Sequence, residues 1–89
     1  MRIDGLLWDD ERIEHISRHG VCITEFEDVC FGKHVAFPAK YGSYVLYGQT
    51  EQGRYLKVII RRLYGNKFEP RACYGMKDSE KKNYRKKMK

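Results

Sequence analysis

The stretch 43–61 decides the fold; it reads SYVLYGQTEQGRYLKVIIR. Two of its segments, 43–49 and 54–61, read as β-strands, and residues 50–53 between them form a polar loop that ends in Gly53. A short glycine-containing loop between two such segments is typical of a hairpin. The segment 54–61 is the more apolar of the two, so we expect it to be the central strand of a sheet.

Further strands are predicted on both sides of this hairpin. Residues 35–37 form a short strand that Pro38 closes, and residues 68–74 return as a strand after a tight turn. Because proline cannot donate a hydrogen bond to a neighbouring strand, Pro70 indicates either an edge strand or a bulge. Residues 6–8 add a short extended segment near the start of the sequence.

Two short helices are predicted before residue 33. Asp9 or Asp10 caps the first helix, and Gly20 ends it in a left-handed conformation. The second helix is expected to start at Thr24 with a capping box and to stop at Gly32.

The end of the sequence is helical again by its spacing. Met76, Glu80, Tyr84 and Met88 recur every four residues, as they would on one side of a helix. The predicted order of elements is therefore β-α-α-β-β-β-β-α. This order defines an α+β fold with an antiparallel meander sheet.

Length and charge narrow the classes of protein that the sequence can specify. The 89 residues are enough for a single domain, 1–89, in which 77–89 form a basic C-terminal helix or tail. The net charge is 18 − 12 = +6, but residues 1–32 hold 3 basic and 8 acidic residues, whereas residues 33–89 hold 15 basic and 4 acidic ones. A chain this basic over its later part is expected to attract polyanions, and nucleic acid is the commonest of them.

The sequence also indicates where the protein works. No apolar run approaches the roughly 18 residues that a membrane span needs, so we expect a cytoplasmic protein without a membrane contact. The cysteines Cys22, Cys30 and Cys73 are odd in number and lack CxxC spacing, which argues against disulfides and a cysteine zinc site. We expect all three to be small buried apolar residues.

Several short motifs follow one another along the chain. They are Trp8-Asp9-Asp10, His19-Gly20-Val21, Glu25-Phe26-Glu27-Asp28-Val29, Tyr47-Gly48-Gln49-Thr50, Gly53-Arg54-Tyr55-Leu56, and Met76 followed by Glu80 and Tyr84. In this order and spacing the chain resembles the BrnT-type toxins of bacterial type II toxin–antitoxin systems, which are similar in fold to RelE-like ribonucleases.

The resemblance implies a function and partners. It implies a metal-independent ribonuclease that inhibits translation, needs no cofactor and acts on RNA, on or off the ribosome. It also implies a cognate antitoxin of the ribbon-helix-helix type, with operator DNA bound only through that antitoxin. One residue departs from the family pattern, because Tyr74 stands where the family usually has arginine. In a regular strand Arg71 points to the face opposite Tyr74, and only a bulge would change this.

Cleavage by a ribose 2′-hydroxyl needs groups that bind phosphate and groups that move protons. Arginine suits the first role because its fork matches phosphate oxygens, and tyrosine or histidine suits the second. The catalytic candidates are Arg61, Arg62, Arg71, Tyr74, Tyr84 and His34, and the RNA-binding candidates are Arg54, Lys57, Lys81 and Arg85.

Each candidate also has a structural interpretation. The arginines can be ordinary solvent-face charges, with Lys57 and Arg61 on one face of their strand and Arg62 on the other. Tyr84 can pack on the sheet, and Glu80 can pair with a basic residue of the sheet.

The histidines and the terminal lysines leave further alternatives. His15 and His19 share a helix face, but HExxH is absent, so no metal site is expected and His19 is expected to cap the helix. The lysines of 77–89 can contact RNA, contact an antitoxin or extend into solvent. The alternative function is a non-catalytic module of the same fold that binds nucleic acid or protein.

Overall fold

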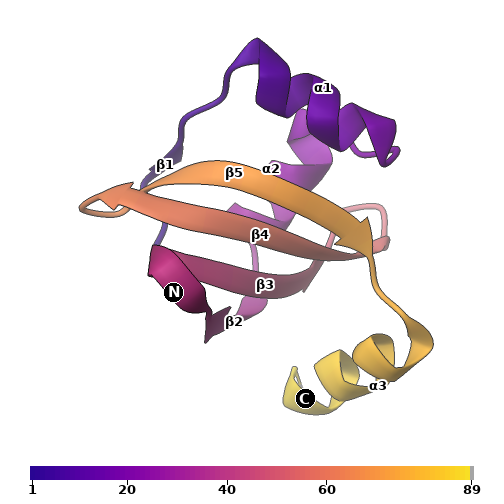
Figure 1. Ribbon diagram of the computed structural model, residues 1–89. Helices are drawn as coiled ribbons and strands as arrows, with labels where there is room; N and C mark the ends of the chain where they lie inside the picture. Colours follow the sequence, from indigo (N-terminus) through magenta and orange to yellow (C-terminus); the bar gives the residue numbers. More distant parts are fainter. Residues whose placement is uncertain (89) are drawn as a thin grey trace.

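The computed structural model describes residues 1–88, which form one five-stranded sheet with three α-helices (Figure 1). The predicted order of elements is confirmed, and Lys89 lies outside the described residues. The elements are β1 Gly5–Leu6, α1 Asp10–Arg18, α2 Ile23–Phe31, β2 His34–Pro38, the 3-10 turn η1 Lys40–Gly42, β3 Ser43–Gln49, β4 Tyr55–Tyr64, β5 Lys67–Gly75 and α3 Asp78–Lys87.

The sheet has the order β1-β5-β4-β3-β2. Strands β2 to β5 form the predicted antiparallel meander, and β4 lies at its predicted central position. The sheet is not antiparallel throughout, because β1 pairs in parallel with β5. This pairing follows from chain direction: β1 enters beside the β4–β5 turn and then leads away to α1.

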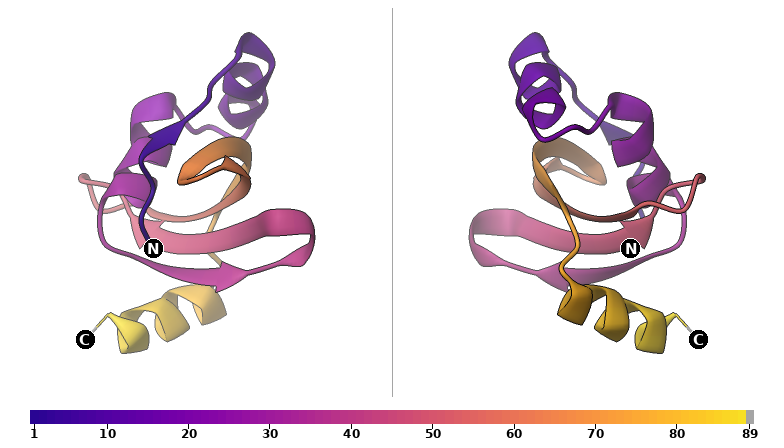
Figure 2. Two further views of the ribbon diagram at one scale, coloured as in Figure 1. Left: turned by 90° about the vertical axis from the view of Figure 1, so that its left-hand side faces the viewer. Right: turned by 90° about the vertical axis from the view of Figure 1, so that its right-hand side faces the viewer.

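The helices lie on different sides of this sheet. Figure 2 shows α1 and α2 on one side and α3 on the other. Phe26 and Val29 of α2 are fully buried in the core cluster together with Leu46 of β3 and Val58 of β4. Helix α1 lies along the outer edge of β5 (Figure 1) and contributes Ile16 to the same core. No helix within residues 1–88 is long and apolar enough to cross a membrane.

The start of α2 differs from the prediction. Asp9 caps α1 and Gly20 is left-handed, as expected, but α2 begins at Ile23 and is capped by Cys22 rather than starting at Thr24. The buried Val21 brings the chain directly from α1 to α2, which leaves only one residue before the first turn. Cys22 is therefore exposed, contrary to the expectation that all three cysteines are buried.

Strand β5 contains a bulge next to Pro70. Ile59 of β4 pairs with Ala72, but the next residue, Ile60, pairs with Pro70, so Arg71 is an extra residue in β5. Pro70 favours this break in the ladder because it has no N–H to donate. The sequence left two interpretations of Pro70, an edge strand or a bulge, and the structure has a bulge.

The bulge reverses which side chains of β5 face the core. In an uninterrupted strand Pro70 and Tyr74 would share a face, and Cys73 would lie on the other. Pro70 and Cys73 are both fully buried instead, whereas Tyr74 is 41% exposed. One inserted residue therefore turns Tyr74 away from the core and Cys73 toward it.

Helix α2 and strand β3 approach closely at Gly48, where an added Cβ would lie 2.8 Å from Val29 Cγ1. We expect Gly48→Ala to lower the free energy of unfolding by about 1–3 kcal/mol, because the fully buried Val29 must shift. Urea denaturation measures the change. Gly75→Ala in β5 is the matched control, since its Cβ would meet nothing within 4 Å. Equal effects of both substitutions would contradict this packing.

Candidate nucleic-acid interface

The faces of β4 and β5 that turn away from α2 form an exposed surface beside α1 (Figure 1). In the register of the two strands Lys57 pairs with Tyr74, and Arg61 pairs with Glu69. Side chains alternate along each strand, so these four lie opposite the core. We call this surface, together with the α1 and α3 side chains that border it, the open ledge.

Three arginines gather around Glu69 at one end of the open ledge. Glu69 Oε1 accepts hydrogen bonds from Arg71 Nη1 at 2.5 Å and from Arg12 Nη2 of α1 at 3.0 Å. The hydrogen bond from Arg71, with the charges of Arg12 and Arg61, holds the pKa of Glu69 below its ordinary value. Three guanidinium groups and one carboxylate give a local charge of 3 − 1 = +2, which is suited to a phosphate.

The other end of the open ledge is a hollow of about 470 Å³. Tyr74 stands in it between two basic groups: the ring of His19 lies 5.2 Å from its ring in an edge-to-face contact, and Lys57 Nζ lies 5.8 Å from its centroid. His19 ends α1, and its ring also contacts that of His15 at 5.5 Å. The residues that line the hollow are His19, Lys57, Tyr74, Gly75, Lys77 and Glu80.

Glu80 of α3 closes this hollow and holds Lys57. Its carboxylate accepts hydrogen bonds from the backbone N–H of Lys77 at 2.9 Å, from Lys57 Nζ at 3.1 Å and from the Tyr47 hydroxyl at 3.3 Å. The Lys77 N–H and then Lys57 lower the pKa of Glu80. The expected pairing of Glu80 with a basic residue of the sheet is confirmed.

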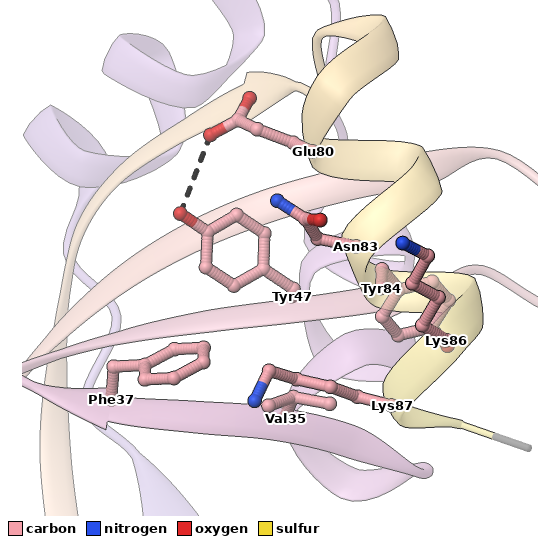
Figure 3. Close-up of a pocket in the computed structure, with 8 residues that line it drawn as sticks. All are labelled: Val35, Phe37, Tyr47, Glu80, Asn83, Tyr84, Lys86 and Lys87. Carbon is pink, nitrogen blue, oxygen red and sulfur yellow. Dashed lines mark hydrogen bonds between the residues drawn. The ribbon is translucent and has the colours of Figure 1, made fainter.

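A second hollow, of about 440 Å³, lies on the far side of Tyr47 between α3 and strands β2 and β3. Figure 3 shows Tyr47 reaching up to Glu80, with Phe37 and Lys87 at the opposite end of the hollow. This hollow has an aromatic floor and no arginine in its lining. Its lining residues are Val35, Phe37, Tyr47, Glu80, Asn83, Tyr84, Lys86 and Lys87.

Two of the candidate arginines do not lie on the open ledge. Arg62 points to the core side, where its guanidinium lies 4.8 Å from the Phe68 ring and hydrogen-bonds the Gly65 carbonyl. Arg54 Nη1 donates to the Gly20 carbonyl at 2.7 Å and to the Glu25 carboxylate at 3.1 Å. Arg54 thus connects the hairpin to the junction between α1 and α2.

Two candidate proton-transfer residues are also elsewhere. His34 shares a register row with Gly48 and Leu56 on the core face; its Nδ1 lies 3.0 Å from the Val29 carbonyl, and burial lowers its pKa. Tyr84 is 7% exposed and packs edge-to-face on Tyr55, and burial raises its pKa. The structural interpretation of Tyr84, packing on the sheet, is confirmed.

The two α3 candidates contact one aromatic ring. Lys81 Nζ lies 5.7 Å and the Arg85 guanidinium 5.1 Å from the centroid of Tyr55, so both lie at the Tyr55 end of β4, away from the arginines around Glu69. Of the predicted residues, the structure therefore brings Lys57, Arg61, Arg71 and Tyr74 together on the open ledge. Among residues 1–88 no group of three His, Cys, Asp or Glu side chains is placed to hold a metal ion.

Sequence reasoning missed Arg12 and Glu69 and gave His19 only a capping role. Arg12 and Glu69 are 57 positions apart, and no local pattern in the sequence joins them. His19 is the C-cap of α1 as expected, but its ring faces Tyr74. The one available signal was Pro70, because a bulge there turns Tyr74 toward the side of Lys57.

The sheet order and the three helices define an α+β fold with an exposed basic face. Among solved structures, this chain is similar to the Brucella abortus ribonuclease toxin BrnT, with a TM-score of 0.67 and 17% sequence identity over 83% of this chain and 97% of that one. The fold that the sequence resemblance implied is thereby confirmed, and at this identity the similarity concerns the fold alone. No protein-family model matches the sequence, and no curated protein matches it.

The buried ring of His34 generates a prediction about acid stability. Its pKa in the folded state lies below the ordinary value of 6.5, so folding favours the neutral ring. The stabilisation is complete above that ordinary value and is lost as pH falls through the lowered folded pKa. We expect urea denaturation to show a loss of stability as pH falls below 6.5 that is smaller in His34→Asn, which cannot titrate. An identical loss in both proteins would contradict this role.

Proposed function

We propose that this protein is the toxin of a type II toxin–antitoxin pair, a metal-independent ribonuclease that inhibits translation by cleaving RNA. The observation that carries the proposal is the open ledge: Arg61, Arg71 and Lys57 share one exposed face with His19 and Tyr74. The fold that presents this face is similar to that of a protein described as a ribonuclease toxin.

The geometry supports a division of labour on the open ledge. The 2′-hydroxyl of one ribose would attack the adjacent phosphate and form the new P–O bond of a 2′,3′-cyclic phosphate. The P–O bond to the next nucleotide would break, and its oxygen would leave as a protonated 5′-hydroxyl. His19 is placed to exchange the protons, since histidine does so near neutral pH and its ring lines the hollow. Lys57 would stabilise the charge that develops on the reacting phosphate, and the arginines around Glu69 would bind the RNA backbone. The exposed Tyr74 ring offers a surface for base stacking.

In this proposal His19 takes the place of His34 and Tyr84. A proton-transfer group must lie within hydrogen-bond reach of the reacting atoms. His34 is on the core face, and the side chain of Tyr84 is buried between α3 and the sheet with a raised pKa, which makes it a poorer proton donor.

The same surface supports a proposal about the partner. A cognate antitoxin, of the ribbon-helix-helix type in our proposal, would neutralise the toxin by covering the open ledge with an acidic segment. Operator DNA would then be bound only through the antitoxin. The protein would act in the cytoplasm, where its RNA substrate is found.

Two observations favour a second function, a non-catalytic module that binds nucleic acid or protein. Tyr74 stands where the resemblance leads us to expect arginine, and Lys57 is already paired with Glu80. A protein of this kind would bind RNA on the open ledge without cleaving it.

Incubation of the purified protein with RNA in EDTA, followed by mapping of the fragment ends, tests the proposal. We expect fragments with 2′,3′-cyclic phosphate ends. His19→Ala should lower the cleavage rate about 10²–10³-fold, the usual loss when one transition-state group is removed. Arg61→Ala should lower it about tenfold, because RNA binding is weakened. Arg62→Ala is the matched control, because Arg62 points to the other face and should leave the rate nearly unchanged.

Three outcomes separate the alternatives. RNA that remains intact but shifts on a gel favours the binding module. Loss of cleavage on addition of EDTA contradicts a metal-independent reaction. Equal losses in Arg61→Ala and Arg62→Ala would show that the open ledge is not the site.

A further inference from the structure

The open ledge has cationic groups at both of its ends. Lys57 and Arg61 lie on the same face of β4, four residues apart, which corresponds to about 13 Å at the usual rise of a β-strand. Between them Ile59 pairs with Ala72, so the middle of the open ledge is apolar. The two cationic positions are thus separate sites along one line.

The arginine end has more positive charge than the fold requires. Glu69 already joins β5 to α1 through Arg12, and it also pairs with Arg71 of its own strand. Arg61 is exposed and has no ion pair of its own within residues 1–88, and the Arg71 side chain remains 39% exposed despite its contact with Glu69. The carboxylate orients Arg71, while the cluster as a whole stays positive and open to solvent.

The hollow end has the features of a reacting site, since His19, Tyr74 and Lys57 meet there. Tyr74 is 41% exposed, and base stacking on such a ring requires an unpaired base.

We infer that a single RNA strand lies lengthwise along β4 and β5, with the reacting phosphate in the hollow beside His19 and a second phosphate of the same strand held by Arg61 and Arg71. This inference rests on the proposed function and adds to it a substrate class: single-stranded RNA that is longer than a dinucleotide. A dinucleotide has one internucleotide phosphate and can occupy only one of the two positions.

Binding of 2′-fluoro RNA oligonucleotides tests this inference without cleavage, because fluorine cannot replace the attacking hydroxyl. Fluorescence anisotropy would compare a labelled dinucleotide with a labelled hexanucleotide of mixed sequence. We expect tighter binding of the hexanucleotide. Arg61→Ala should weaken it about tenfold and reduce the slope of log K against log salt by about one, and it should weaken dinucleotide binding less.

A charge-matched comparison removes the effect of net charge. The double variant Arg61→Ala/Arg71→Ala is compared with Lys40→Ala/Lys82→Ala, which removes two exposed lysines outside the open ledge. Only the arginine variant should lose the preference for the hexanucleotide. Thermal unfolding checks that both variants fold, and Arg61→Ala alone keeps the contacts of Glu69 intact.

The outcomes separate this inference from the proposed function. A length preference that depends on the arginines supports the inference even if RNA is never cleaved, in which case only the catalytic proposal fails. Cleavage with no length preference, or equal weakening of dinucleotide and hexanucleotide by Arg61→Ala, overturns the inference. Displacement of the hexanucleotide by hexaglutamate at equal concentration would also overturn it, because the cluster would then accept any acidic chain.

Discussion

A single inserted residue in β5 determines which side chains the open ledge contains. Arg71 has no counterpart on β4, and from that point onward the alternation of β5 is reversed. Cys73 enters the core opposite Val58, and Tyr74 comes to lie beside Lys57. Without this bulge the side chain of Tyr74 would face the core. The open ledge would then lose the aromatic ring that β5 contributes to it.

The electrostatics of the open ledge depend on two carboxylates that form ion pairs with the surrounding basic side chains. Glu69 joins the sheet to α1 through Arg12 and also pairs with Arg71 of its own strand, and Glu80 joins α3 to the sheet through Lys57. Each carboxylate orients basic side chains at a small cost in positive charge, since the Glu69 cluster remains net positive. Pre-oriented cations of this kind suit phosphate, because little reorganisation remains when the ligand arrives.

Much of the fold could be predicted from the sequence, because local signals are strong in this chain. The central hairpin, the Asp9 cap and the left-handed Gly20 all follow from residue types at adjacent positions. The candidate site was harder to predict from the sequence. The opposite orientations of Arg61 and Arg62 follow from alternation, but the contacts Arg12–Glu69 and His19–Tyr74 depend on α1 lying along β5, which no local pattern encodes. Pro70 indicated a bulge only as one of two possibilities, so the side on which Tyr74 lies required the structure.

The orientation of Cys73 gives the most direct measurement of the bulge, because a regular β5 would expose this thiol and bury Tyr74. Burial raises the pKa of Cys73 to about 12, whereas Cys22 is exposed at the start of α2. Alkylation of the native protein with iodoacetamide, followed by mass-spectrometric mapping, compares the two thiols in one sample. The expected result is rapid modification of Cys22 and protection of Cys73 until the protein is unfolded. Modification of Cys73 as fast as Cys22 would contradict the reversed register and the open ledge that depends on it.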